Sequence, residues 1–372
     1  MTQDITAFLP ASGDLLAFGE PVHGEPAFRH VRNDLFARLT GLGFRSIALE
    51  IDRVAALAVD DYVRHGIGDL DDVLRDGFSH EFGALGGNRE LVVWMREYNE
   101  GRPLEQRLTF HGFDAATETM WAPSPRTYLE HARDYLGLDF PGGDDIAALA
   151  GDDERWHRTE AIMDPAESIG ATGEADRLRV LADDMLTALY VSAPPLIAAT
   201  SIEAWRRAEI HLTAGLGLLR YHRLAAQPLD RGERVARLLA VRDAIMARNL
   251  LDIRRLGPVF VFAHNTHLQR NPARWQLADM DLRWSGAGAI LAALGEPFTF
   301  VAGSLGRSSA LNLGEPDPDT YEGDLQTRIA TWGLTKSATG RIRTDPTPEQ
   351  GYFPLNDVTL EGADAILHIN AA

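Results

Sequence analysis

Cysteine is absent from this chain of 372 residues, and lysine occurs only once, at Lys336. Without cysteine the protein can form no disulfide bond, no thiolate metal site and no thiol nucleophile, which favours a cytoplasmic location. A single lysine nearly excludes Schiff-base chemistry and the phosphate-binding loops that depend on a lysine. Enzymes of these classes are therefore poor candidates.

Long hydrophobic runs and basic clusters are also missing. No apolar run approaches the roughly 20 residues that cross a bilayer, and the first four residues have no basic segment typical of a secretory signal. There are 36 Lys and Arg against 54 Asp and Glu, a net charge of −18. We therefore expect neither a nucleic acid nor a membrane as partner, and predict a small-molecule substrate.

Several catalytic motifs cannot be found. The chain has no Gly-x-Ser-x-Gly nucleophile elbow, no His-Glu-x-x-His zinc motif, no Walker A loop and no Gly-x-Gly-x-x-Gly turn. The sequence therefore argues against a standard serine esterase. An enzyme with this sequence must activate water or the substrate directly, without a bound organic cofactor.

The first 115 residues alternate apolar runs with helical periodicity. Residues 15–18, 46–51 and 108–114 are typical of buried strands, and apolar spacing predicts helices over 28–42, 54–64 and 89–99. Strands separated by helices indicate βαβ units, so we expect an α/β fold with a mixed, largely parallel central sheet flanked by helices.

The pattern changes after Asp114. Helices are predicted over 176–189, 202–223 and 233–256, and the Gly/Asp-rich residues 141–145 are predicted to form a loop. Strand and helix signals resume at 259–263, 287–294, 298–302 and 365–369, and residues 303–364 are expected to be mostly loop. We therefore predict an α/β catalytic core of residues 1–115 and 257–372, with a helical insertion at 116–256 that lines the cleft.

The first cluster of polar residues follows the first predicted strand. Glu20 and His23 lie three positions apart in a turn shaped by Pro21 and Gly24. A carboxylate beside an imidazole holds its tautomer and raises its basicity, as suits a general base acting on water. The alternative is a turn with a helix-capping acid and a solvated histidine.

The second cluster, His264 and His267, follows the strand predicted at 259–263. In open α/β sheets, ligands gather at the carboxyl ends of the strands, so both clusters are expected in one pocket. There the two histidines can donate hydrogen bonds to a developing oxyanion. Alternatively, Glu20, His23, His264 and His267 can hold a metal ion such as zinc, manganese or iron; the spacing does not decide between these roles.

Three further residues are candidates. Glu50 and Asp114 each end an otherwise apolar strand, where a buried carboxylate needs a charged or hydrogen-bonding partner. Arg32 lies nine residues beyond His23, about two and a half helical turns along the first helix. We expect Arg32 to pair with Glu50 or to bind an anionic intermediate, although a solvated helix arginine is the commoner case.

Several short strings, taken together, resemble the erythromycin esterase family. They occur in order from about residue 14 to 302, and are Gly19-Glu20-Pro21-Val22-His23-Gly24, Ala48-Leu49-Glu50, Trp94-Met95-Arg96-x-Tyr98-Asn99, Phe110-His111-Gly112-Phe113-Asp114, Arg242-Asp243-x-x-Met246-x-x-Asn249 and Ala263-His264-Asn265-x-His267. Val22 stands where many members have threonine. Between Ala115 and Leu256, only the string at 242–249 aligns.

The resemblance implies a mixed α/β core with helical additions and a deep cleft, and hydrolysis of the lactone ester of 14-membered macrolides. It implies that His23 is the general base on water, with Glu20 as its neighbour. Further expected catalytic residues are Glu50, Arg32, His264 and His267, and the expected substrate contacts are Asp114, His111 and Asn265.

We thus predict a hydrolase that cleaves an ester or macrolactone by direct water attack. One alternative is a non-hydrolytic tailoring enzyme of natural-product biosynthesis, which would catalyse a cyclisation or an elimination in the same pocket. The other is a catalytically inactive homologue that binds a small molecule.

Overall fold

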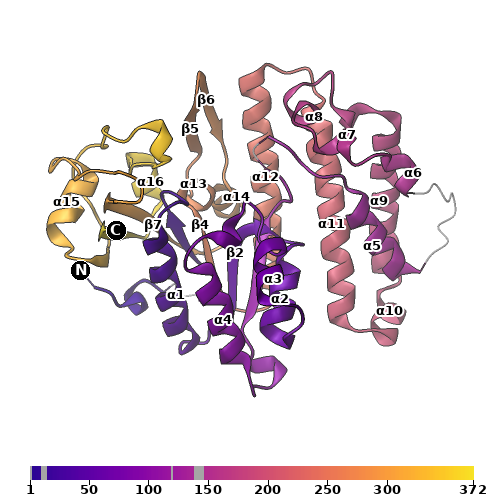
Figure 1. Cartoon of the computed structure of the whole chain (residues 1–372), viewed down its shortest axis with the longest axis horizontal. Coiled ribbons are helices and arrows are strands. Elements are labelled where there is room, and N and C mark those ends of the chain that lie inside the picture. The colour runs from indigo at the N-terminus through magenta and orange to yellow at the C-terminus, as the bar shows by residue number, and fades with distance from the viewer. Residues whose placement is uncertain (1, 10–14, 119, 138–145) are drawn as a thin grey trace.

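A seven-stranded sheet forms the centre of the protein in the computed structural model, which describes residues 2–9, 15–118, 120–137 and 146–372 (Figure 1). The strand order is β3-β2-β4-β1-β7-β9-β8. The strands are β1 (Leu15–Glu20), β2 (Ser46–Asp52), β3 (Thr109–Asp114), β4 (Val259–His264), β7 (Thr299–Arg307), β8 (Trp332–Thr335) and β9 (Ala365–Ala371). All neighbours are parallel except β8 and β9. The predicted mixed, largely parallel sheet is confirmed.

Alternating side chains of the strands face two separate cores. In β1, Leu16 and Phe18 pack on one face of the sheet, whereas Leu15 and Ala17 pack on the other. The helices that contribute apolar side chains to the first core are α1 (Pro26–Thr40), α2 (Ala56–His65), α3 (Leu70–Asp76) and α4 (Asn88–Asn99). Those on the second are α12 (Arg231–Arg254), α13 (Asn265–Leu268), α14 (Ala287–Ala293), α15 (Tyr321–Arg328) and α16 (Asp357–Gly362). Because the strands are buried on both faces, their sequences are continuous apolar runs.

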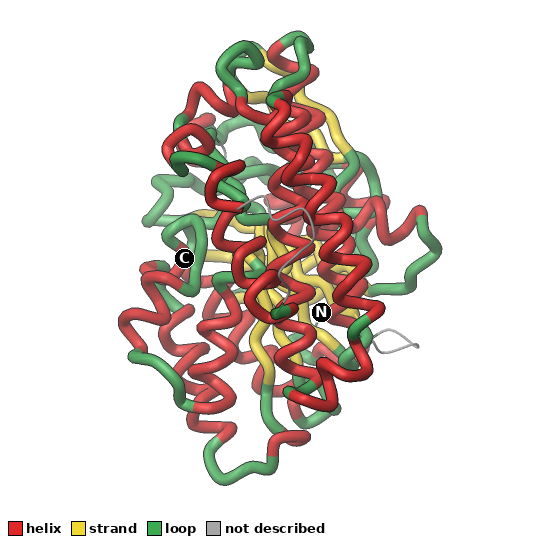
Figure 2. The backbone as a smooth tube through the Cα atoms, turned by 90° about the vertical axis from the view of Figure 1, so that its right-hand side faces the viewer, coloured by secondary structure: helices red, strands yellow, loops and turns green. Residues whose placement is uncertain are grey.

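A group of helices follows β3 and has an apolar core of its own. It comprises α5 (Arg126–Leu136), α6 (Ile146–Ala150), α7 (Glu154–His157), α8 (Thr159–Met163), α9 (Gly173–Val191), α10 (Ala193–Ala199) and α11 (Ile202–Ala225). Figure 2 looks onto these helices, with the sheet behind them. The chain returns to the sheet through α12, which packs against α11, β3 and α14. The predicted loop at 141–145 lies outside the described residues.

The region after β4 is more ordered than the sequence analysis expected. A hairpin of β5 (Ala273–Leu277) and β6 (Met280–Trp284) projects from the sheet, and residues 303–364 contain the end of β7, α15, β8 and α16. The segment 303–364 nevertheless consists mostly of turns and irregular structure, as expected. Its short elements are stabilised by tertiary contacts, which local composition does not reveal.

Short 3₁₀ helices complete the described chain: η1 (Ile5–Phe8), η2 (Phe82–Ala84), η3 (Leu104–Gln106), η4 (Ile169–Ala171) and η5 (Pro348–Gln350). Within the described ranges, no single helix has the length and apolar character needed to cross a membrane. The pair α9 and α10 meets that test only jointly, and it is bent by 69°.

Candidate active site

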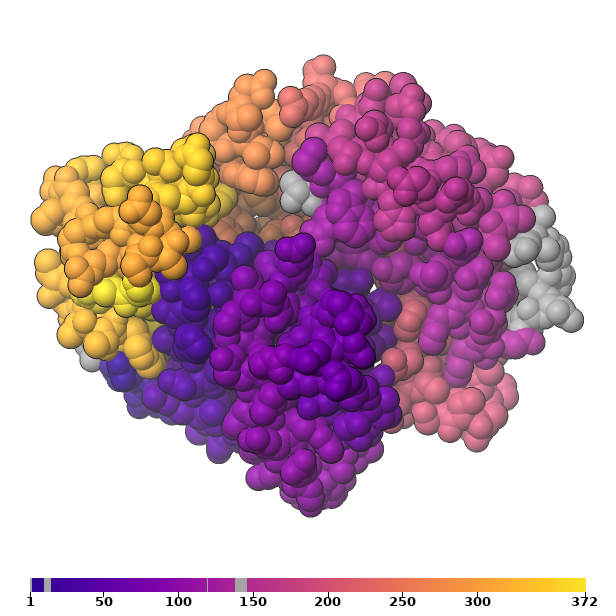
Figure 3. Space-filling model, in the orientation of Figure 1, coloured from indigo at the N-terminus to yellow at the C-terminus, as the bar shows by residue number. Residues whose placement is uncertain are grey.

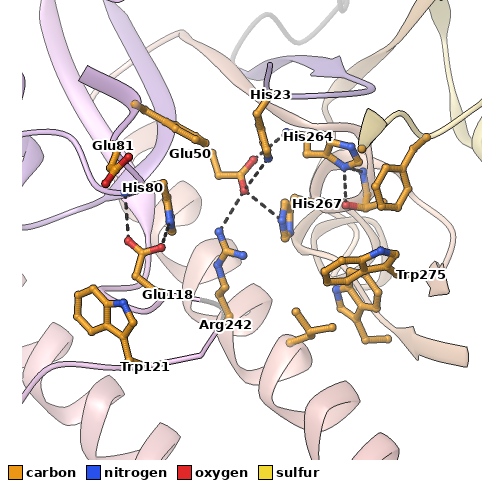
Figure 4. A pocket seen from close by; sticks show the side chains of 16 residues that line it. His23, Glu50, His80, Glu81, Glu118, Trp121, Arg242, His264, His267 and Trp275 are labelled. Carbon is orange, nitrogen blue, oxygen red and sulfur yellow. Dashed lines mark hydrogen bonds and ion pairs between the residues drawn. The ribbon is translucent and has the colours of Figure 1, made fainter. Parts of the chain in front are cut away.

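A cavity of about 550 Å³ lies at the carboxyl ends of β1, β2 and β4. Figure 3 shows the surface hollowed where the N-terminal segment, the helical segment after β3 and the region of the β5–β6 hairpin meet. In Figure 4, Glu50 lies between His80, Glu118 and Trp121 on one side and Trp275 on the other. The two histidine clusters therefore meet in one place, as the topology rule predicts.

His23 is held in the turn between β1 and α1. Its Nδ1 lies 2.8 Å from Oε1 of Glu20, and its backbone carbonyl accepts a hydrogen bond from Arg29. The side chain is 36% exposed and lines the cavity. Burial opposes protonation of the ring, but the carboxylates of Glu50 and Glu20 outweigh burial and raise the pKa of His23 above 6.5.

Glu50 is the most highly connected carboxylate in the cavity. Its Oε1 lies 3.1 Å from Nη2 of Arg242, 3.2 Å from Nε2 of His267 and 3.8 Å from Nε2 of His23. Its Oε2 accepts a hydrogen bond of 2.8 Å from the backbone N–H of His264. Burial alone would raise the pKa of Glu50, but the surrounding cations hold it well below 4.5. Glu50 is therefore an ionised anchor and not a proton donor.

His267 is a buried imidazolium between two carboxylates. Its Nδ1 donates to Oδ1 of Asp243 at 2.8 Å, and its Nε2 faces Glu50. Although burial opposes the charge, Asp243 and Glu50 raise the pKa of His267 to about 10. Asp243 also accepts hydrogen bonds from the Trp284 indole at 2.7 Å and from the backbone N–H of Ala287 at 2.8 Å. One buried carboxylate thus fixes both a histidine and an aromatic wall residue.

His264 has the opposite charge state. Burial lowers the pKa of His264 to about 3, and the neighbouring His23 ring, 5.3 Å away between centroids, adds to this effect. Its Nδ1 lies 2.8 Å from the Thr266 hydroxyl and accepts a hydrogen bond of 3.3 Å from the Thr266 backbone N–H, so we assign the remaining proton to Nε2. Nε2 is buried, and a backbone hydrogen bond to the Pro21 carbonyl raises the pKa of the ring without outweighing burial.

A second acid–base group faces the same cavity. His80 lies 2.5 Å from Glu118 and 3.1 Å from Asp114, which raise its pKa to about 9 against the effect of burial. Asp114 does not line the cavity, and its carboxylate also binds Arg242 at 2.5 Å and 2.9 Å. Asp114 thus contacts His80 and Arg242, and its role as a substrate contact stays a prediction.

Arg32 does not reach the cavity. Its guanidinium is buried beneath the site and donates to Asn88 at 2.9 Å and to the Gly87 carbonyl at 3.2 Å, and it lies over the Phe262 ring. Burial lowers its pKa to about 9. The predicted pairing with Glu50 is made by Arg242 of α12 instead, because α1 directs Arg32 toward α4.

Two other predicted substrate contacts have different partners. His111 is bonded to Thr109 at 3.1 Å and does not line the cavity, and burial lowers its pKa to about 3. Asn265 exchanges two hydrogen bonds of 2.9 Å with the backbone of Gly303. It crosses Gly19 so closely that a Cβ at Gly19 would lie 2.0 Å from its side-chain oxygen. Asn265 therefore ties β4 to β7 across β1.

Several cavity residues were not assigned a role from sequence. Arg242 and Asp243 stand in one of the strings that carry the family resemblance, and their positions in that string were the available signal. His80 lies in a turn and itself has a positive φ of 58°, and no sequence pattern marks it. The remaining side chains are mainly aromatic or acidic: Glu81, Phe82, Glu118, Trp121, Trp275, Trp284 and Phe353.

The alternative of a metal ion on Glu20, His23, His264 and His267 finds no matching geometry. Among the described residues, no three histidine or carboxylate side chains are arranged to hold a metal ion. The donor atoms are engaged elsewhere: Nδ1 of His23 with Glu20, and both ring nitrogens of His267 with Asp243 and Glu50.

A family model described as erythromycin esterase matches residues 40–368. The chain belongs to the erythromycin esterase family. The sequence resemblance is therefore confirmed, and it extends beyond residue 302 into the segment that showed no recognisable string. No curated protein sequence matches the chain significantly.

Solved structures of this family's fold are similar over nearly the whole chain. A Bacillus cereus protein has 16% identity and a TM-score of 0.70, covering 97% of this chain and 89% of its own. A histidine-to-asparagine mutant of the erythromycin esterase EreC in its open conformation has 18% identity and a TM-score of 0.68, covering 99% and 94%. A succinoglycan biosynthesis protein has 16% identity and a TM-score of 0.67, covering 97% and 88%. At these identities the likeness shows the fold.

Proposed function

We propose that this family member is a hydrolase that cleaves a carboxylic ester or lactone by direct attack of water. The observation that carries the proposal is the pairing of a half-exposed His23 with Glu20 in a cavity whose other polar groups are fixed. Family membership supports esterase-like chemistry. A macrolide is one candidate substrate, because a structural neighbour is an erythromycin esterase.

In the proposed mechanism, His23 is the general base. Glu20 accepts a hydrogen bond from Nδ1–H, which keeps that proton on Nδ1 and leaves Nε2 as the basic nitrogen on the cavity side, near Glu50. Water gives its proton to Nε2 while its oxygen attacks the ester carbonyl, and the imidazolium then protonates the leaving alkoxide. Glu50 stabilises the imidazolium by its negative charge.

The tetrahedral intermediate needs donors for its oxyanion. His264 suits this role because its ring is neutral and lines the cavity beside His23. Arg242 and His267 add positive charge on the cavity wall. Such fixed donors act in a low-dielectric site without reorganising during the reaction.

Hydrolysis of p-nitrophenyl esters and of 14-membered macrolactones by the His23→Asn variant tests the proposal. Loss of a general base lowers kcat by about 10²–10⁴-fold. His30→Asn is the matched control, because His30 is exposed on α1 and lines no described cavity. Equal turnover by wild type and His23→Asn, with unchanged thermal unfolding, would refute the role of His23.

The alternative non-hydrolytic reaction is distinguished by labelling. In ¹⁸O-water, hydrolysis introduces one ¹⁸O atom into the acid product, whereas cyclisation or elimination introduces none. A catalytically inactive binding protein would give no product from any ester of the panel.

A further inference from the structure

A second cavity, of about 750 Å³, adjoins the candidate active site. It is bounded by the β5–β6 hairpin on one side and by residues 342–359 on the other. Four residues line both cavities: Thr266, Trp275, Gly351 and Phe353. Each cavity alone has the size of a drug-sized ligand site, about 300–1,000 Å³. A ligand of the first cavity therefore has room to continue into the second, which we call the hairpin groove.

Phe353 and Trp275 lie where the two cavities join. Their ring centroids are 6.3 Å apart, and the Phe353 ring lies 4.6 Å from the ring of His264. Figure 4 shows Trp275 on the side of the active-site cavity opposite His80 and Glu118. The groove therefore begins beside the proposed oxyanion donor.

The segment that carries Phe353 is fixed to the catalytic turn. The backbone N–H of Phe353 donates to the Pro21 carbonyl at 3.0 Å, one residue after Glu20. On either side, Tyr352 and the backbone N–H of Leu355 bond to the buried carboxylate of Glu322 at 3.0 Å and 2.8 Å. The groove is thus built at a fixed distance from His23.

The two cavities differ in chemical character. The active-site cavity is lined by ionised groups such as Glu50, Arg242 and His267. In the hairpin groove the two arginines are paired, Arg274 with Asp281 and Arg343 with Asp345. About half of the remaining wall is proline, aliphatic or aromatic, with neutral amides and hydroxyls between, and the carboxylate of Asp357 accepts a hydrogen bond from Tyr321. A neutral, largely apolar ligand arm fits such a wall, since each of its charged side chains already has a partner within the protein.

We propose that the hairpin groove binds the long, uncharged and mainly apolar arm of the ester whose carbonyl lies at His23, an inference that rests on the proposed hydrolase function. The substrate class is therefore an ester or lactone with an extended neutral chain or ring on one side. Ile342 and Val358, exposed at 41% and 43%, are specificity-determining residues of this groove.

Turnover of p-nitrophenyl acetate, octanoate and dodecanoate, below their critical micelle concentrations, tests the inference. For wild type we expect kcat/KM to rise at least tenfold from acetate to the long esters. Ile342→Trp and Val358→Trp fill the groove, and we expect kcat/KM of these variants to show no such rise with chain length. Val180→Trp is the matched control, because Val180 is an exposed valine on α9 outside both cavities. Equal length dependence in all variants would overturn the inference.

A binding measurement tests the hairpin groove independently of the proposed hydrolase activity. The dodecyl and ethyl ethers of p-nitrophenol contain no cleavable carbonyl, and tryptophan fluorescence reports their binding beside Trp275. Tighter binding of the dodecyl ether by at least tenfold, lost in Ile342→Trp, supports the groove. If no ester is hydrolysed while this binding persists, the hydrolase proposal fails and the groove stands. Equal binding of both ethers would overturn the groove.

Discussion

Glu20→Gln is the most informative single substitution, because it removes a charge and keeps the shape. Oε1 of Glu20 lies 2.8 Å from Nδ1 of His23, and the Glu20 side chain is only 5% exposed. The amide oxygen of glutamine can accept the same hydrogen bond. The variant therefore retains the tautomer of His23 and loses only the negative charge that favours the imidazolium.

The expected shift follows from the energy of that hydrogen bond. A bond to a charged group contributes about 1.5–3 kcal/mol, against about 0.5–1.5 kcal/mol for a neutral one. The difference of about 1–2 kcal/mol corresponds to roughly one pKa unit at 1.36 kcal/mol per unit. The carboxylate raises the pKa of His23, so its removal lowers the pKa of His23 by about one unit.

The pH profile of kcat/KM measures this shift. A general base must be neutral, so activity rises as pH increases through the pKa of His23, and wild type should show this acid limb above pH 6.5. In Glu20→Gln the limb should move about one pH unit lower, and the plateau should fall because a less basic imidazole is a weaker base. Glu81→Gln, which removes a different carboxylate of the same cavity, should leave the limb in place. An unmoved limb, or one displaced to higher pH, would refute the reasoning.

The remaining predictions concern the residues around Glu50. Arg242→Met should lower kcat/KM by about 10²–10³. Arg32→Met should leave kcat/KM within about threefold but lower the free energy of unfolding by about 1–3 kcal/mol, because it leaves buried acceptors without their donor. Steady-state kinetics and urea denaturation check both variants, and the reverse pattern would show that Arg32 acts in the active site. Asp243→Asn should lower the pKa of His267, as measured by NMR titration. It should also weaken the hydrogen bond of the Trp284 indole, as measured by fluorescence quenching. An unchanged titration of His267 would contradict the role of Asp243 in stabilising its charge. Because the pKa of His267 is raised to about 10, its contribution to stability is fully present below pH 6.5 and is lost as pH rises toward 10. The unfolding free energies of wild type and His267→Asn, compared across that pH range, measure this loss. A difference that stays constant with pH would contradict the prediction.

The strands of the sheet could be predicted because each is buried on both faces. Runs such as 46–51 and 259–263 carry enough apolar residues to identify them without any tertiary information. The hairpin β5–β6 could not be recognised in the same way. Its alternation is short, and Trp275 and Leu282 find their apolar partners on α12, far away in sequence. The short elements after β7 depend on similar long-range contacts, such as those of Glu322.

Within the site, the residues at or just after strand ends could be predicted, whereas the contributions of α1 and α12 could not. Glu20, Glu50, His264 and His267 follow from the rule that parallel strands end at one edge of the sheet. Helix direction has no such rule: Arg32 is close to His23 in sequence, yet its guanidinium turns to Asn88. The cation that does bind Glu50 comes from α12, 192 residues away from it in sequence.

The order of the strands explains why two segments so distant in sequence form one site. β4 is inserted between β1 and β2, so Glu20 and His264 are direct neighbours in register, and the His264 N–H reaches Glu50 on the other side. The insertion forces the chain to leave the sheet after β3 and to return through α12, which carries Arg242 and Asp243. Hence the helices that separate the two clusters in sequence also supply the charges that hold Glu50 and His267 in place.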